Sequence, residues 1–445
     1  MALSVSTCTP LCFQTQARLN VKMMRSNCGP QGVKTLLESV GIPRMITAPQ
    51  LSLQTGNWVK LICGAGFEDV VDVRNLSLVY TLAGVDCIDC AADASVVGAV
   101  NEGIEAARRI VPLRRPWVMI SVNDDEDLHF RKAEFDPEDC PLDCSRPCVL
   151  VCPANAILLS TGKSSELHHD GSSLQEKWRG GVITERCYGC GRCFPVCPYD
   201  KIRVTTYVRD AKTTAELLVR NDVDAIEIHT NGRQFDSFKA LWTDLGGSYG
   251  CLKLVAISLP DVGESTTALM SSMFSIMKPD LHGCNLWQLD GRPMSGDIGR
   301  GATREAVAFA VRLARATDRP PGFLQLAGGT NAHTVDYLKK EGLFQETSKA
   351  SLSCNIWHMS VSIEDALQDR DMDSPPSSWN SPIGGIAYGG YARKIVGRIL
   401  SSMQSKFGLT ACIEDHPEFL REALIEALSL VGTVKCYDLA FIHQN

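Results

Sequence analysis

Eight of the nineteen cysteines in this 445-residue chain fall between Cys140 and Cys197, and this clustering constrains the fold and the chemistry more than any other feature. Disulfide bonds staple small secreted domains, whereas closely grouped cysteines in a chain of this size are typical of metal binding in a reducing compartment. The clustered cysteines therefore predict metal sites and not a disulfide framework.

The second group of cysteines is followed by proline and has the spacing C-x2-C-x2-C-x3-C-P: Cys187, Cys190, Cys193 and Cys197. This is the spacing with which bacterial ferredoxins hold iron–sulfur clusters, and the fourth cysteine of that motif binds the neighbouring cluster. Gly189 and Gly191 lie between the cysteines and supply the backbone freedom needed to wrap a cubane closely.

The first group has one extra residue in each of its first two gaps: Cys140, Cys144, Cys148 and Cys152. Both groups close alike, as Cys-Pro-Ala-Asn-Ala-Ile and Cys-Pro-Tyr-Asp-Lys-Ile, which indicates an internal repeat. The crossed pattern predicts two [4Fe-4S] clusters. One would be held by Cys140, Cys144, Cys148 and Cys197, and the other by Cys187, Cys190, Cys193 and Cys152. One cluster beside a degenerate site, or zinc, are the alternatives.

Residues 1–37 contain no acidic side chain but carry Arg18, Lys22, Arg25 and Lys34 among many Ser, Thr and Gln residues. This composition is typical of a transit peptide and lacks the long apolar run of a secretory signal. It predicts import into the plastid stroma, with mitochondrial import or a tail of no targeting function as alternatives.

Short apolar runs alternate with stretches of helical period over the rest of the chain. Eight runs have strand character: Val59–Cys63, Val85–Cys90, Trp117–Val122, Ala225–His229, Leu254–Leu259, Asn285–Leu289, Phe323–Ala327 and Gly385–Ala387. The helical stretches that alternate with them include Ala94–Arg109, Ala211–Arg220, Phe235–Leu245, Thr266–Met277, Arg304–Ala316, Thr334–Lys340 and Tyr391–Met403, which makes eight strands with eight helices. This pattern predicts an α/β fold, a (β/α)8 barrel, with a doubly wound open sheet as the alternative.

The cysteine-rich segment interrupts the barrel pattern and reads as an inserted ferredoxin-like domain. The predicted order is a presequence (1–37), a first barrel part (38–123), the insert (124–209), a second barrel part (210–403) and a helical extension (404–445). The segment from Gln345 to Pro382 is rich in Ser, Asp and Pro, with a short helix expected at Ile363–Leu367, and is typical of a lid or a surface loop.

Glycine pairs follow the seventh and eighth predicted strands, where barrels often bind phosphate: Gly328 and Gly329, and Gly389 and Gly390. Their N–H groups would suit FMN or a sugar phosphate, although glycine there also serves simply to turn the chain. Other polar residues at predicted strand ends are Asn123, His229, Arg233, Asp290 and Arg292. His229 is either a general acid–base group or a hydrogen-bonded structural residue.

Cys87 and Cys90 form one more C-x2-C pair, but they lie in a predicted strand, where residues three apart face opposite ways. We expect them to be buried packing residues. The net charge of −7 argues against nucleic acid as a general partner, and no run approaches the ~20 apolar residues of a membrane-spanning helix.

The segments Cys140-Pro-Leu-Asp-Cys-Ser-Arg-Pro-Cys-Val-Leu-Val-Cys-Pro and Arg186-Cys-Tyr-Gly-Cys-Gly-Arg-Cys-Phe-Pro-Val-Cys-Pro-Tyr, with their barrel-like flanks, resemble the cyanobacterial light-dependent period family. The resemblance covers nearly the whole chain beyond the presequence. It implies an iron–sulfur protein of circadian input that reports cellular redox state to the clock. The presequence suggests a plastid version, in which cluster binding carries over more readily than the clock role.

The leading hypothesis is therefore a redox-sensing or electron-transfer protein with two clusters and a partner protein of unknown identity. A flavin-dependent barrel oxidoreductase fed by its own ferredoxin-like domain is the second hypothesis, and whether the chain is an enzyme is left open. A third is a scaffold in which the clusters only stabilise the insert.

Overall fold

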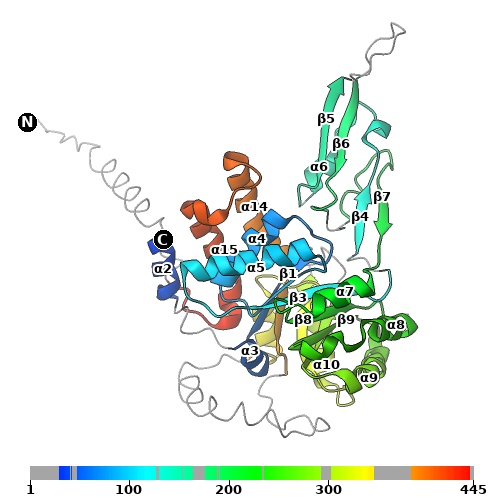
Figure 1. Ribbon diagram of the computed structural model, residues 1–445, viewed down its shortest axis with the longest axis vertical. Coiled ribbons are helices and arrows are strands. Elements are labelled where there is room, and N and C mark those ends of the chain that lie inside the picture. Colours follow the sequence, from blue (N-terminus) through cyan, green and yellow to red (C-terminus); the bar gives the residue numbers. More distant parts are fainter. Residues whose placement is uncertain are drawn as a thin grey trace, which may run out of the picture.

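The computed structural model describes residues 30–40, 42, 48–126, 130–152, 154–163, 176–187, 189, 191–232, 235–291, 302–344 and 382–440. Eight parallel strands close into a barrel in the order β1-β12-β11-β10-β9-β8-β3-β2 (Figure 1). They are β1 (Trp58–Gly64), β2 (Cys87–Ala91), β3 (Trp117–Asn123), β8 (Ala225–His229), β9 (Leu254–Pro260), β10 (Cys284–Asp290), β11 (Phe323–Ala327) and β12 (Gly385–Tyr388). The predicted (β/α)8 barrel is confirmed.

Closure depends on the pairing of β1 with β12, which runs in parallel register from Trp58 opposite Gly385 to Leu61 opposite Tyr388. A Cβ atom at Gly385 would lie 2.2 Å from the carbonyl oxygen of Trp58, so only glycine permits this approach. Because the first and last strands are paired, the open doubly wound sheet is wrong.

A helix follows each strand and packs its apolar face on the outside of the barrel. These helices are α4 (Val70–Leu82), α5 (Ala94–Ile110), α7 (Ala211–Leu218), α8 (Phe235–Leu245), α9 (Thr266–Met277), α10 (Ala302–Arg315), α11 (Thr334–Lys340) and α14 (Gly390–Phe407). Three begin at an aspartate whose carboxylate accepts hydrogen bonds from the first free N–H groups of the helix: Asp69, Asp93 and Asp210.

Additional helices flank the barrel at both ends of the chain: α2 (Pro30–Ser39), α3 (Pro49–Thr55) and α15 (Pro417–Lys435). Val33, Leu36 and Leu37 of α2 are almost completely buried and belong to the main apolar core, as does much of α15. The expected presequence boundary after residue 37 therefore falls inside a packed helix. The barrel's last helix, α14, ends at Phe407, beyond the boundary expected at residue 403.

Between β3 and α7 the chain leaves the barrel and forms a projecting arm (Figure 1). It contains two antiparallel pairs: β4 (Arg131–Glu134) with β7 (Arg203–Thr206), and β5 (Ile157–Lys163) with β6 (Glu176–Val182). The short helices η1 (Pro137–Asp139) and α6 (Pro147–Val151) complete it. Cys190, Arg233, Arg292 and the helix expected at Ile363–Leu367 lie outside the described residues.

The loop between β1 and α4, residues 65–69, holds the root of the arm, and we call it the docking loop. Nζ of Lys132 donates to the carbonyl oxygens of Gly66 (2.8 Å) and Thr184 (2.6 Å) and lies 3.1 Å from Oε2 of Glu68. Arg209 donates to the other oxygen of Glu68 at 2.7 Å. Asp69 caps α4 with one oxygen and accepts from Arg186 of the arm with the other, at 2.7 Å.

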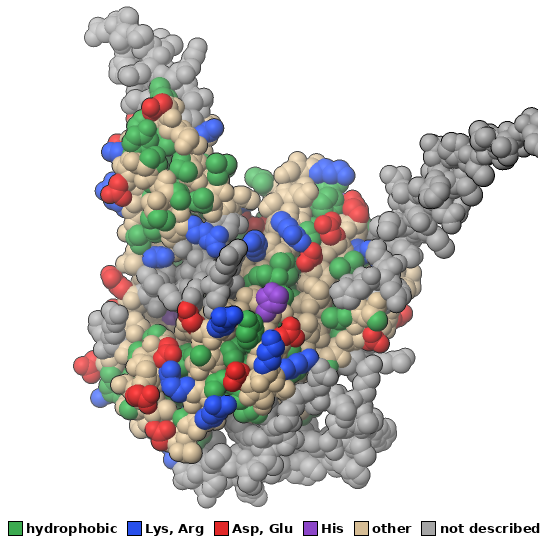
Figure 2. All heavy atoms as spheres, turned by 180° about the vertical axis from the view of Figure 1, so that it is seen from behind, with side chains coloured by type: hydrophobic (Ala, Val, Ile, Leu, Met, Phe, Trp, Pro, Cys, Tyr) green, Lys and Arg blue, Asp and Glu red, His purple; other side chains and the backbone are tan. Residues whose placement is uncertain are grey.

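The surface in Figure 2 carries hydrophobic side chains over much of the projecting arm, interspersed with charged ones. Its exposed large hydrophobic residues are Leu142, Leu150, Leu158, Tyr199, Val204 and Val208. Within the described ranges, no helix combines the length and the apolar character needed to cross a membrane.

Candidate metal centre

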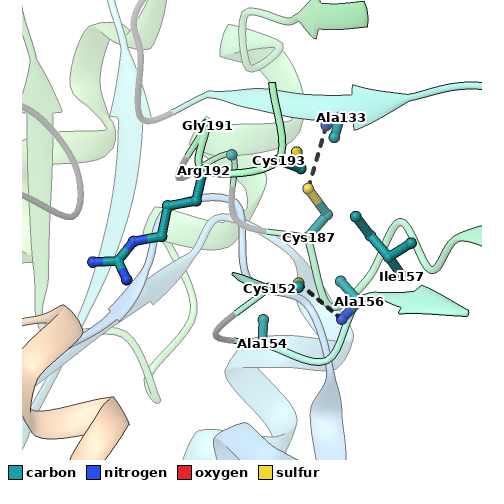
Figure 3. Close-up of a pocket in the computed structure, with 10 residues that line it drawn as sticks. Ala133, Cys152, Ala154, Ala156, Ile157, Cys187, Gly191, Arg192 and Cys193 are labelled. Carbon is teal, nitrogen blue, oxygen red and sulfur yellow. Dashed lines mark hydrogen bonds between the residues drawn. The ribbon is translucent and has the colours of Figure 1, made fainter. Parts of the chain in front are cut away.

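A cavity at the base of the arm brings together cysteines from both motifs (Figure 3). It encloses about 360 Å³, including space open to solvent, and its lining contains Cys152 of the first motif with Cys187 and Cys193 of the second. The rest of the lining is small or apolar except for Arg192, whose side chain extends away from the cysteines in Figure 3. These three cysteines are three of the four that the crossed pattern assigns to one cluster, and the fourth, Cys190, is not among the described residues.

Backbone N–H groups point at the sulfur atoms of three cysteines. Ala133 donates to Sγ of Cys187 at 3.3 Å, and Ala156 donates to Sγ of Cys152 at 3.2 Å (Figure 3). Lys201 donates to Sγ of Cys197 at 3.4 Å. Hydrogen bonds of this kind stabilise thiolate ligands and are one of the means by which a protein sets the reduction potential of a cluster.

Gly189 and Gly191 have positive φ angles of 69° and 76°, as the motif led us to expect. A Cβ atom at Gly189 would lie 2.2 Å from the carbonyl oxygen of Arg131, and one at Gly191 would lie 2.6 Å from the guanidinium of the same arginine. Arg131 in turn donates to the carbonyl oxygen of Gly189 at 2.6 Å. The cysteine loop is therefore folded tightly over β4, and only glycine fits at these two positions.

The other four cysteines also lie near one another. Burial raises the pKa of the Cys140 thiol, and the neighbouring groups Cys144, Cys148 and Cys197 raise it further. Burial likewise raises the pKa of Cys148, with Cys144 and Cys197 adding to the rise. Cys197, from the second motif, is thus a neighbour of Cys140 and Cys148 of the first motif.

The internal repeat read from the sequence is visible in the backbone. Asn155 and Asp200 stand three residues after the last cysteine of each motif and both have left-handed φ angles, 48° and 49°. Each of these residues donates its N–H to the carbonyl oxygen of that cysteine at 3.4 Å. The two halves of the arm therefore end in the same turn, which presents the next N–H group to the cysteine sulfur.

Across the residues that the structure describes, no three His, Cys, Asp or Glu side chains are grouped so as to hold a single metal ion. Cys87 and Cys90 are both free and fully buried. They fall in different apolar clusters: Cys87 lies inside the barrel and Cys90 lies between the strands and the helices. This agrees with the prediction that the two side chains face opposite ways.

The two glycine pairs lie at neighbouring strand ends, because β11 pairs with β12. Gly328 and Gly329 have positive φ angles of 57° and 131°, so the turn itself requires glycine there. The hydroxyl of Thr330 donates to the carbonyl oxygen of Ala387 at 2.5 Å and holds the first glycine loop against β12. Gly390 begins α14 and is buried.

The strand-end residues have different surroundings. Asn123 ties the two chain segments of the arm's root together, because its amide donates to the carbonyl oxygens of Asp125 and Tyr207 and accepts from the N–H of Arg209. His229 has Nε2 3.0 Å from Oε1 of Glu227. Asp290 accepts from the hydroxyl of Ser258.

Three buried charged residues inside the barrel were not predicted as site residues from the sequence: Lys60, Asp89 and Glu227. Each interrupts an apolar strand, in Val-Lys-Leu, Ile-Asp-Cys and Ile-Glu-Ile respectively. A buried parallel strand is expected to be apolar throughout, so a single charge within one is a signal that would have found them.

A (β/α)8 barrel with an inserted domain that carries two ferredoxin-type cysteine motifs defines an iron–sulfur protein. The family model described as "LdpA Fe-S cluster-binding domain" matches residues 140–208, and the family model described as "Light dependent period A C-terminal domain" matches residues 217–433. The protein "Light dependent period A" of Synechococcus elongatus is 38% identical over 387 residues, which is 87% of this chain and 94% of that protein. The chain belongs to the light-dependent period A family.

Proposed function

We propose that the chain binds two [4Fe-4S] clusters and acts in redox sensing or electron transfer. The observation that carries the proposal is the cavity in which Cys152 of the first motif meets Cys187 and Cys193 of the second. Exchange of the fourth cysteine between motifs is the feature of two-cluster ferredoxins. The nearness of Cys197 to Cys140 and Cys148 supports the reciprocal half of this exchange.

A [4Fe-4S] cluster supplies one-electron redox chemistry when it is bound. The chain's own residues would hold the clusters through the eight cysteine sulfurs and would stabilise the thiolates through the N–H groups of Ala133, Ala156 and Lys201. Cys187 and Cys193 are buried, whereas Cys140 and Cys144 are half-buried. The set that contains Cys140 is therefore the more accessible one, and we assign electron exchange with a partner protein to it.

The exposed hydrophobic residues of the arm favour such a partner, because apolar surface on a projecting element is typical of a protein contact. The relative from Synechococcus elongatus is named for a light-dependent period. We propose redox responsiveness for this chain, and we do not extend the period function itself to it.

We also propose that the protein is imported into the plastid stroma, on the basis of the composition of its N-terminal segment. Val33, Leu36 and Leu37 pack into the main core, so we place the end of the targeting segment before Pro30. N-terminal sequencing of the protein isolated from plastids tests both statements. A mature chain that starts within α2, or an absence of the protein from plastids, contradicts them.

The decisive test is anaerobic purification of the chain from Pro30 onward, with iron, sulfide and flavin analysis and a visible spectrum. We expect about eight irons and eight sulfides per chain, as two cubanes require. Cys193→Ala should lose or convert one cluster, whereas Cys251→Ala, an exposed and free cysteine at the end of η2 (Gly246–Cys251), should lose none. Zinc in place of iron, or an unchanged iron content in Cys193→Ala, contradicts the proposal.

A second candidate is the flavin-dependent barrel oxidoreductase. The two glycine pairs favour it, because they lie at the ends of the neighbouring strands β11 and β12. These are the positions at which barrel enzymes often bind a phosphate. Stoichiometric flavin in the same preparation would favour this candidate, with the clusters delivering electrons to it.

A further inference from the structure

The side chains that point into the barrel change character along the strands. At the amino-terminal ends they form an apolar plug together with Leu53 of α3. The strand residues of this plug are Trp58, Cys87, Trp117, Met119, Ala225, Leu254, Ala256, Leu286 and Phe323. Two residues further along most of the same strands the buried side chains are polar: Lys60, Asp89, Ser121, Glu227, Ser258, Gln288 and Gln325. Barrels are stabilised at the amino-terminal end of the strands and bind their substrates at the carboxyl-terminal end.

The polar half is a network that crosses the barrel. Nζ of Lys60 on β1 donates to Glu227 on β8 and lies 3.8 Å from Asp89 on β2. The amide of Gln288 donates to the other oxygen of Glu227 at 2.5 Å, and the amide of Gln325 donates to Gln288 at 2.8 Å. Replacing buried ion pairs of this kind with apolar residues often leaves stability unchanged or raises it, so the fold alone does not account for them.

Two buried aspartates, three residues apart, show the difference between a structural and an incomplete site. Asp86 lies at the amino-terminal end of the barrel and accepts from Ser52, Lys435 and the N–H of Val59, which satisfies both of its oxygens. Asp89 accepts from Ser121 at 2.6 Å through one oxygen. Its other oxygen, Oδ2, is buried and lies 3.8 Å from Nζ of Lys60, too far for a hydrogen bond, and it accepts none. An unsatisfied carboxylate oxygen of this kind suits a ligand that brings a hydrogen-bond donor.

The two carboxyl groups nearest Lys60 have opposite protonation preferences. Burial raises the pKa of Asp89 to about 7, and the charge of Glu227 adds to this rise while Lys60 opposes it. Burial also acts to raise the pKa of Glu227, but Lys60 and His229 outweigh it and hold that pKa well below its ordinary value. Neighbouring acids whose pKa values are driven apart are typical of sites that bind or transfer protons.

The carboxyl-terminal end of the barrel supplies the remaining walls. Asp290 on β10 pairs with Ala327, the residue before the Gly328–Gly329 turn, and accepts from Ser258. At the end of β8, the ring of His229 packs edge to face against the ring of Phe130 from the root of the arm, with the ring centroids 5.4 Å apart. The carboxylate of Asp290 therefore lies beside the strand end that carries Gly328 and Gly329, and His229 lies against the first residues of the insert.

We propose that the barrel holds a second site, separate from the clusters, which binds a phosphorylated polyol. Its hydroxyl groups would donate to Asp89 and Asp290, and its phosphate would meet the N–H groups of the two glycine loops. The ribityl phosphate of a flavin and a free sugar phosphate share this chemistry. Lys60 and Glu227 position Asp89 and His229 and do not themselves meet the ligand, since Lys60 donates to Glu227, whose oxygens are also occupied by Gln288 and His229.

The test measures thermal unfolding of the full cluster-containing chain with inorganic phosphate, ribose 5-phosphate or FMN at millimolar concentration. We expect ribose 5-phosphate or FMN to raise the midpoint by about 3 °C more than phosphate does. Asp89→Asn should weaken that binding roughly tenfold, because a ligand hydroxyl loses a carboxylate acceptor. Ser258→Ala, which removes the hydroxyl that donates to Asp290, should weaken it less, and Asp244→Asn on the exposed face of α8 should leave it unchanged.

A larger shift with ribose 5-phosphate assigns the site to a free sugar phosphate, and a larger shift with FMN assigns it to a flavin. Equal shifts with all three probes mean an anion site at the glycine loops only and overturn the proposal, as does the absence of any shift. Unweakened binding in both Asp89→Asn and Ser258→Ala overturns it too. The iron content, measured in the same samples, reports on the clusters independently, so failure of this site and failure of the cluster assignment are distinguishable.

Discussion

The barrel and the inserted arm are held together in different ways. The barrel's core is a continuous set of apolar side chains between strands and helices, with a second apolar plug inside the strands. The arm has one small cluster of eight buried residues: Ala133, Phe135, Cys148, Ala156, Ile157, Cys187, Cys193 and Ile202. Three of the eight are cysteines that we assign to clusters. The barrel therefore has a core of its own, whereas the arm's core includes the ligands of its proposed cofactors.

From this difference we predict that metal loading and folding are coupled in the arm and are separate in the barrel. A domain with so little apolar burial depends on metal binding for its stability, because the site does not exist in the unfolded chain. The barrel should behave as an ordinary cooperative domain whether or not iron is present.

The largest expected effect is loss of the arm's fold on loss of its ligands. In Cys193→Ala, hydrogen exchange should become fast for the amides of β4 to β7 and stay slow for β1 and β9. Cys251→Ala is the matched control and should exchange like the wild type. Slow exchange throughout the arm of the cluster-free protein would mean that the arm folds without metal.

The next largest effect is expected from a substitution in the core of the barrel, which should destabilise the barrel and leave the arm's metal content unchanged. Trp58 is fully buried in the apolar plug, so Trp58→Ala should lower the free energy of unfolding of the barrel by about 3–5 kcal/mol. Chemical denaturation measures this loss, and the iron content of the still-folded variant should stay at the wild-type value. Leu409→Ala, at an exposed position, should change neither quantity.

Gly189→Ala should break the cysteine loop without removing a ligand. The added Cβ atom would lie 2.2 Å from the carbonyl oxygen of Arg131, at a φ of 69°, so the loop must move away from β4. We expect a loss of roughly 2 kcal/mol in the arm, from strain and displacement together, and incomplete iron loading. Gly246 also has a positive φ, but its Cβ position is surrounded by open space. Gly246→Ala is therefore the control that measures the cost of the backbone conformation without a clash. Equal effects of the two variants would contradict the clash.

The junction between the two regions should be weaker than either. Glu68→Gln removes the charge that faces Lys132 and Arg209, and we expect a loss of about 1 kcal/mol with faster proteolysis at the arm's root. Glu105→Gln alters an exposed helix-surface pair with Arg108 and serves as the control, with an expected change near zero. Resistance to proteolysis equal to that of the wild type would show that the docking loop does not hold the arm.

The smallest effect concerns the pH dependence of the barrel. Because the pKa of Asp89 is raised to about 7, the folded protein keeps that proton between about pH 4 and 7 while the unfolded chain has lost it. The contribution of Asp89 to stability is therefore present at low pH and is lost as the pH rises toward 7. Relative to the wild type, Asp89→Asn should become more stable from pH 5 to pH 8 in urea unfolding. A constant difference would contradict the raised pKa.

The sequence predicted the barrel well because buried parallel strands are short, uniformly apolar runs. Ala225–His229 and Phe323–Ala327 have the predicted bounds, as do helices α8, α9 and α11. The burial of Leu36 and Leu37, beside the boundary expected at residue 37, could not be predicted from local composition, because it depends on packing against distant parts of the chain. Lys60, Asp89 and Glu227 were missed because their partners lie on different strands and meet only inside the closed barrel.

The pairing of β1 with β12 also orders events during synthesis. Translation delivers β1 early and β12 near the end of the chain, so the ribosome releases almost the entire polypeptide before the ring can close. Until then the edges of β1 and β11 are unpaired, and such edges promote aggregation. Ring closure is therefore the last step in folding of the barrel, and a chaperone that covers the open edges until β12 is available would limit aggregation.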